Sequence, residues 1–249
     1  MFPVIPLGPI ILPTYSLLLL VALWAGNWLA ARRASQLQVD ANHVYNVTLY
    51  GLLAGFIGAR FWYVITHWDS YIGQLSQALT LAPIALAGGE GLAMAGLVIF
   101  IYLQRQHVPL GTFADALAPG LALAALIAHW GDFLSGQALG QPTTLPWAIT
   151  IANAARHPVG LYEALGCLLI LISLFVSHRY LPWAGFQFWL VVALYGLNRL
   201  ALEPFHEQPE LIGSGFLIGQ VVGLLVAVVA LAVMAYNFTS QPTELGIRN

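Results

Sequence analysis

Seven stretches of predominantly apolar residues alternate with short polar segments along the 249-residue chain. A helix needs roughly 20 apolar residues to cross the hydrocarbon core of a bilayer, which is about 30 Å thick. The seven stretches reach or approach that length, and their bounds are 13–31, 45–66, 81–103, 112–130, 160–177, 184–203 and 211–236. The pattern therefore predicts an all-α polytopic membrane protein with about seven transmembrane helices.

One longer segment, residues 131–159, breaks this pattern because glycine, proline and threonine interrupt it. Its centre, Gly140-Gln141-Pro142-Thr143-Thr144-Leu145-Pro146-Trp147, has the composition of an interfacial loop. We therefore expect a loop or arm region between spans four and five. The whole chain, residues 1–249, is expected to form a single integral membrane domain that includes this region.

Composition supports the membrane class. Hydrophobic residues make up 59% of the chain and charged residues only 7%, and the mean hydropathy is +0.80. Soluble domains carry about 25% charged residues. The net charge of −2 gives no indication of a nucleic-acid partner, and the single Cys167 excludes a disulfide within the chain.

The arginines predict the orientation. Those that follow spans one, three, five and seven are Arg32, Arg33, Arg105, Arg179 and Arg248, whereas the loops on the opposite side contain only Arg156. Because cytoplasmic loops are enriched in basic residues, we expect the N-terminus and the arm region outside and the C-terminus in the cytoplasm.

Several charged residues fall within or at the ends of apolar spans, where a charge costs about 2.5–3.5 kcal/mol on insertion scales. Tyr195, Arg199 and Glu203 recur every four residues, so a helix would place them on one face. Arginine suits phosphate binding, but an Arg–Glu pair that joins two helices explains the spacing equally well. Arg199 and Glu203 are in either case expected to face a cavity lined by protein.

His129 and Asp132 lie three residues apart at a helix end, the arrangement of an imidazole oriented by a carboxylate. An ordinary polar helix end explains this pair as well. Glu90 lies among glycines inside span three, and helix packing explains the glycines but not the acid.

Three further groups have simpler explanations. Arg156 and His157 are typical of anchoring at the membrane interface. Arg60 is expected to extend toward the interface among aromatic residues, and Asp115 to cap the start of span four.

Together, these motifs resemble the prolipoprotein diacylglyceryl transferase family over most of the chain. The matching residues are Tyr15; Gly58-Ala59-Arg60 with Tyr63; Asp115 with Ala118-Pro119; Arg156-His157-Pro158 with Leu161-Tyr162-Glu163; Tyr195-Gly196 with Arg199 and Glu203; and Gly219-Gln220. The resemblance implies seven spans with the orientation given above.

The chain also departs from the family pattern. Where members carry a His-Gly-Gly block with an essential histidine, this chain has Gly89-Glu90-Gly91. Where they carry Gly-Arg-x-Gly-Asn-Phe-x-Asn-Gly-Glu, the arginine, first asparagine and glutamate are replaced by His129, Asp132 and Gln137. These replacements predict a less cationic site, suited to handling protons, with weak or absent activity toward phosphatidylglycerol.

The resemblance implies a bacterial plasma-membrane enzyme of lipoprotein biosynthesis. It would transfer diacylglycerol from phosphatidylglycerol to the lipobox cysteine thiol of a prolipoprotein. The catalytic candidates are His129, Glu90, Asp132, Arg199 and Glu203, and the candidates for lipid or phosphate binding are Arg199, Arg60, Arg156, His157, Tyr15, Tyr195 and Tyr162.

If the chain is a transferase, Glu90, His129, Asp132 and Arg199 should gather in one cavity. No metal or cofactor is indicated, because the spacing of His and acidic residues matches no recognisable ligand pattern. The alternative is a catalytically inactive member of the same fold that binds lipid or serves as a scaffold.

Overall fold

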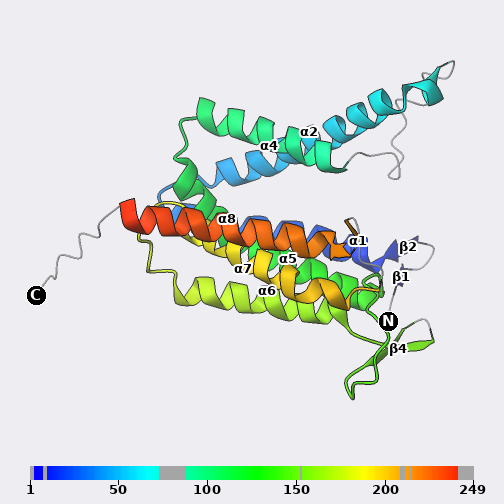
Figure 1. Ribbon diagram of the computed structural model, residues 1–249. Helices are drawn as coiled ribbons and strands as arrows, with labels where there is room; N and C mark the ends of the chain where they lie inside the picture. The colour runs from blue at the N-terminus through cyan, green and yellow to red at the C-terminus, as the bar shows by residue number, and fades with distance from the viewer. Residues whose placement is uncertain are drawn as a thin grey trace, which may run out of the picture. The chain divides into compact units, whose positions relative to one another are not determined.

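The computed structural model describes residues 3–7, 10–72, 88–151, 153–207, 211–212 and 215–240. This part of the chain is mostly helical (Figure 1). The long helices are α1 (Thr14–Gln36), α2 (Asn42–Thr66), α4 (Gly88–Arg105), α5 (Leu110–Ser135), α6 (Val159–Val176), α7 (Phe186–Leu202) and α8 (Ile218–Ser240). The predicted helical membrane class is confirmed at this level.

Among the described residues, α1, α2, α5, α6 and α8 are long and apolar enough to cross a membrane. Helices α4 and α7, with 18 and 17 residues, do not reach this standard of length and composition. The first residues of predicted span three, 81–87, lie outside the described part. The count of seven spans therefore stays a prediction.

The chain forms two compact units. Helices α2 and α4 pack together in the unit Gln38–Leu110, and the other unit consists of Met1–Leu37 and Gly111–Asn249. This second, larger unit is called the main bundle below. It contains α1, α5, α6, α7 and α8.

Three short antiparallel hairpins accompany the helices, and the sequence pattern did not predict them. They are β1 (Val4–Leu7) with β2 (Ile10–Pro13), β3 (Ile149–Ile151) with β4 (Ala154–Arg156), and β5 (Leu211–Ile212) with β6 (Phe216–Leu217). The β3–β4 hairpin lies in the predicted arm region, of which the first residues, up to Ser135, continue α5.

The arm region, residues 136–158, is fixed to the segment that follows α7. Gln141 donates a backbone hydrogen bond of 2.8 Å to Phe205, and Glu207 donates one of 2.9 Å to Leu139. The segment after α7 begins with the short 3₁₀ helix η2 (Glu203–Phe205). These backbone pairs give the arm a defined position beside the C-terminal end of α7.

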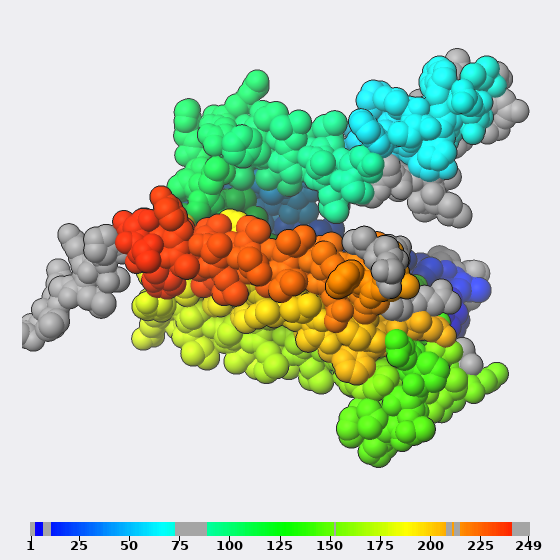
Figure 2. Space-filling model, viewed as in Figure 1, coloured from blue at the N-terminus to red at the C-terminus, as the bar shows by residue number. Residues whose placement is uncertain are grey.

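Helices α7 and α8 lie side by side in the main bundle (Figures 1 and 2). A Cβ at Gly196 would lie 2.8 Å from the carbonyl oxygen of Gly223, and a Cβ at Gly223 would lie 2.8 Å from that of Gly196. Lipid tails are as apolar as the helices, so membrane helices associate through close packing of small residues. This pair of glycines permits that close approach.

Asp115 caps a different helix from the one predicted. It lies in the second turn of α5, so its carboxylate does not cap the start of that helix. Its oxygens instead accept backbone hydrogen bonds of 2.7 Å from Gly185 and 3.1 Å from Phe188, at the start of α7. The first backbone N–H groups of a helix have no partner within the helix, so α5 supplies the cap of α7.

Candidate active site

His129 on α5 lies between two carboxylates. Its Nδ1 is 3.3 Å from Oδ2 of Asp132, one turn later in the same helix, and 3.1 Å from Oε2 of Glu163 on α6. An ionised carboxylate only accepts hydrogen bonds, so Nδ1 carries the donated proton. This arrangement fixes the ring and directs Nε2 away from the acids.

Glu163 is also contacted by a guanidinium and a second imidazole, through its other carboxylate oxygen. Arg199 Nη1 on α7 donates a 3.1 Å hydrogen bond to Glu163 Oε1, and His206 Nε2 lies 3.2 Å from the same oxygen. The Glu163 side chain is only 5% exposed. It therefore joins groups from α5, α7 and the segment after α7 at one buried point.

Arg199 is held by two acids. Its Nη2 lies 2.7 Å from Oε2 of Glu203, in addition to the Nη1 contact with Glu163. The arginine side chain remains 38% exposed, whereas Glu203 is 6% exposed. The guanidinium therefore keeps an open face toward a ligand while its position is set from behind.

Glu203 itself lies against a glycine of α8. A Cβ at Gly219 would overlap the carboxylate of Glu203. The side chain at position 219 must therefore be absent for Glu203 to adopt its place beside Arg199.

Tyr195 connects this polar cluster to an apolar pocket. Its hydroxyl lies 3.2 Å from Nε2 of His129, and its side chain also lines a pocket of about 270 Å³. The other lining residues come from α5, α6, α7 and α8 and are Leu121, Ala122, Ala125, Cys167, Ile170, Val191, Val192 and Val226. The polar residues thus adjoin an apolar pocket that suits a hydrocarbon chain. We call His129, Asp132, Glu163, Tyr195, Arg199, Glu203 and His206 the polar cluster.

The polar cluster is rich in acid. Glu163 and Glu203 contact the guanidinium of Arg199, and Asp132 contacts His129. Three acids thus stand beside one guanidinium and the imidazoles of His129 and His206. One ligand atom each from His129, Asp132 and Glu163 lies within 4.8 Å of the others, a spacing that could hold a metal ion. Arg199 already binds Glu163 there, and its positive charge opposes a second cation at the same carboxylate.

The arm region contributes a second group of the predicted residues. Arg156 Nη1 lies 2.6 Å from Glu207 Oε1 and donates a 3.0 Å hydrogen bond to the carbonyl of Gly140. Arg156 was expected to anchor at lipid headgroups, but its guanidinium pairs within the protein. These contacts of the Arg156 guanidinium hold the arm region in place.

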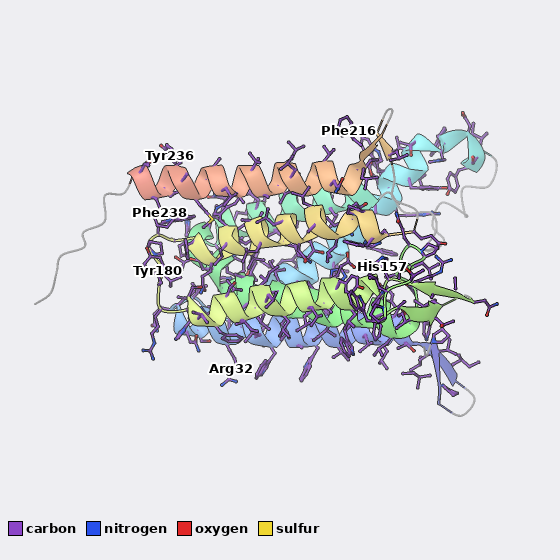
Figure 3. The ribbon with its side chains drawn as sticks, turned by 60° about the horizontal axis from the view of Figure 1, so that its bottom comes forward. Arg32, His157, Tyr180, Phe216, Tyr236 and Phe238 are labelled. Carbon is purple, nitrogen blue, oxygen red and sulfur yellow. The ribbon has the colours of Figure 1, made fainter. Side chains whose placement is uncertain are left out.

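His157 and Tyr162 also face protein groups. Nδ1 of His157 lies 3.4 Å from the Tyr162 hydroxyl, which accepts a 2.8 Å hydrogen bond from Trp147. The His157 ring further packs edge-on against Phe205. Figure 3 shows His157 at the end of the main bundle that carries the arm.

The remaining candidates lie elsewhere. Tyr15, in the first turn of α1, lies against Gly131 of α5, where a Cβ would be 3.5 Å from its ring. Glu90 is exposed in the first turn of α4, and Arg60 on α2 is buried, with its guanidinium over Tyr63 and Tyr71. Glu90 and Arg60 belong to the Gln38–Leu110 unit, so the predicted gathering of Glu90 with the cluster stays a prediction.

Three residues of these networks were not predicted as site residues. Glu163 stands in the Tyr162-Glu163 pair of a matching motif, which was a usable signal. His206 continues the spacing of Arg199 and Glu203, one residue beyond η2. Glu207 was not among the candidates, because no sequence spacing links it to Arg156.

Comparison with known proteins decides the family. The sequence profile of the prolipoprotein diacylglyceryl transferase family matches residues 3–236. The chain belongs to this family. The resemblance inferred from the motifs is therefore confirmed, and the chain is a transferase by family.

Individual relatives agree with the family match. The phosphatidylglycerol–prolipoprotein diacylglyceryl transferase 2 of Streptomyces coelicolor is 30% identical, over 99% of this chain and 81% of the relative. The enzyme of Thermosynechococcus vestitus is 33% identical, over 88% and 86%. That of Finegoldia magna is 28% identical, over 91% of each.

Proposed function

We propose that the protein transfers the diacylglyceryl group of phosphatidylglycerol to the lipobox cysteine of a prolipoprotein. The observation that carries this proposal is the junction at Tyr195. There, a cluster with an open guanidinium and an oriented imidazole adjoins an apolar pocket of about 270 Å³. An amphiphilic substrate with a phosphodiester and acyl chains matches both parts.

The reaction makes a thioether bond between the cysteine sulfur and a glyceryl carbon. The bond from that carbon to a phosphate oxygen breaks, the thiol proton passes to a base, and glycerol phosphate leaves. His129 is the proposed base through Nε2, because its Nδ1 is directed at the carboxylates. Arg199 would bind the phosphate through its open face, with Glu163 and Glu203 positioning it.

The membrane arrangement is part of the proposal. We infer seven spans in the bacterial plasma membrane, with the N-terminus and the arm outside and the C-terminus in the cytoplasm. This inference rests on the five arginines that follow spans one, three, five and seven, against Arg156 on the other side. The polar cluster would then face the outer side, where prolipoproteins emerge.

The purified protein can be tested with phosphatidylglycerol labelled in its glycerol headgroup and a lipobox peptide. We expect release of labelled glycerol phosphate and a matching mass increase on the peptide cysteine. His129→Ala should lower kcat by about 100-fold or more, the usual contribution of a general base. Arg199→Gln should raise KM for the lipid, and Arg179→Gln, at the other end of the bundle, is the matched control.

Two results would contradict the proposal. Saturable binding of phosphatidylglycerol without any transfer by the wild-type protein would favour the inactive lipid-binding alternative. Undiminished transfer by His129→Ala would remove His129 as the base, and Glu90→Gln would then be the next variant to assay.

A further inference from the structure

A second pocket lies in the main bundle, at the end away from the polar cluster. Its volume is about 480 Å³, larger than the pocket at Tyr195. It is formed by the last turns of α1 and α6, the first turn of α7 and Pro119 of α5. The polar cluster uses the opposite ends of α6 and α7. Figure 3 shows Arg32 and His157 toward opposite ends of the bundle.

The pocket carries positive charge. Arg32, Arg33 and His178 line it, and none of the lining residues is acidic. Within the described part of the chain, neither Arg32 nor Arg33 forms an ion pair. Asp115 acts electrostatically on Arg33, but its carboxylate is buried and binds the start of α7.

The two arginines have different positions. Arg33 is fixed by uncharged acceptors, because it donates hydrogen bonds of 3.0 Å to the His178 carbonyl, 3.1 Å to Gln187 and 3.2 Å to Gln36. Arg32 is exposed and its guanidinium lies 4.9 Å from the ring centre of Trp28. A charge held by hydrogen bonds, on Arg33, and an exposed charge over an aromatic ring, on Arg32, together suit an anionic group.

Apart from these groups and the amides of Gln36 and Gln187, the lining is apolar. Leu29, Leu174 and Phe175 face the pocket, and Phe175 is 55% exposed. A free anion needs no such surface, whereas an acyl chain would cover it. Basic pockets between transmembrane helices are known sites for anionic lipid headgroups.

We propose that this pocket binds one anionic phospholipid, with its phosphodiester at Arg32 and Arg33 and an acyl chain along Leu174 and Phe175. This lipid is separate from the substrate at Tyr195, and the proposal does not depend on the transferase reaction. The ligand is identified by its chemistry, a phosphodiester joined to hydrocarbon chains.

Photoactivatable phosphatidylglycerol tests the proposal on the full-length protein in nanodiscs. We expect crosslinks to peptides containing Trp28–Arg33 or Leu174–His178, in addition to any at the substrate site. Arg32→Gln should weaken the crosslinks at this pocket roughly fivefold, since one cation near an anionic headgroup contributes about that factor. Arg105→Gln, which removes an exposed arginine of the Gln38–Leu110 unit, should leave them unchanged.

Controls separate the possible sources of the signal. Arg199→Gln removes the phosphate contact at the substrate site and should leave the crosslinks at Arg32 intact. Competition by phosphatidylglycerol but not by phosphatidylcholine or inorganic phosphate is the expected result. Equal crosslinking of wild type and Arg32→Gln, or full competition by inorganic phosphate, would overturn the proposal.

Discussion

At the scale of single residues, Glu163 is the side chain on which the polar cluster depends. It is buried, and its two oxygens contact His129 on one side and Arg199 and His206 on the other. A buried carboxylate is stabilised in such a place because a guanidinium and two imidazoles surround it. Glu163 thus contacts both the proposed base, His129, and the proposed phosphate-binding residue, Arg199.

Glu163→Gln should lower kcat by about 10- to 100-fold, because a charge-assisted hydrogen bond contributes about 1.5–3 kcal/mol. KM for phosphatidylglycerol should change much less, since Arg199 keeps its contact with Glu203. Steady-state kinetics of the folded variant measure this difference. Asp40→Asn, which alters an exposed carboxylate outside the cluster, is the control, and a wild-type kcat for Glu163→Gln would refute the positioning role.

Sequence spacing predicted part of this cluster. The four-residue spacing of Tyr195, Arg199 and Glu203 indicated one helical face, and the structure places all three in the cluster. The role of Glu163 could not be derived in this way, because spacing describes one helix and not how its face is turned toward another. Contacts between helices depend on packing that no local pattern encodes.

At the scale of elements, α7 is positioned from both ends. Its start is capped by Asp115 of α5, and its C-terminal half packs on α8 through Gly196 and Gly223. The helix has only 17 residues, so attachment at each end fixes the positions of Tyr195 and Arg199 along the bundle.

The short hairpins were not predicted, because strands of two to four residues are too short to show an alternating pattern.

Asp115→Ala should destabilise the protein by about 1–3 kcal/mol, because it leaves two backbone N–H groups in a buried place without an acceptor. Asp115→Asn keeps one carboxamide oxygen and should cost less. The apparent Tm in detergent measures both variants. Activity per folded molecule should stay close to wild type, because Asp115 lies at the far end of the bundle; an Asp115→Ala protein as stable as wild type would contradict the capping role.

At the scale of the whole molecule, the sequence predicted the membrane class and the family, and both are confirmed. It could not determine how the chain divides into units, since that depends on contacts between distant segments. The structure separates the Gln38–Leu110 unit, with Arg60 and Glu90, from the main bundle, with the rest of the candidate residues. The number of spans also depends on how the helices lie in the bilayer.

Reporter fusions can determine the topology. A reporter inserted near Leu145 should be located outside the cytoplasm, and one fused after Asn249 should be located inside it. The physical reason is the excess of arginines at the ends of spans one, three, five and seven. Reporters on the same side would exclude the three spans predicted between Leu145 and the C-terminus.

The contact between Gly219 and Glu203 has a consequence for how relatives of this chain diverge. Since the carboxylate of Glu203 fills the volume that a side chain at position 219 would need, residue 219 cannot be enlarged while Glu203 keeps its place. A lineage that shortened Glu203 would be released from glycine at 219, whereas one that first enlarged residue 219 would lose the partner of Arg199. Glycine at position 219 is therefore expected to persist wherever Glu203 pairs with Arg199.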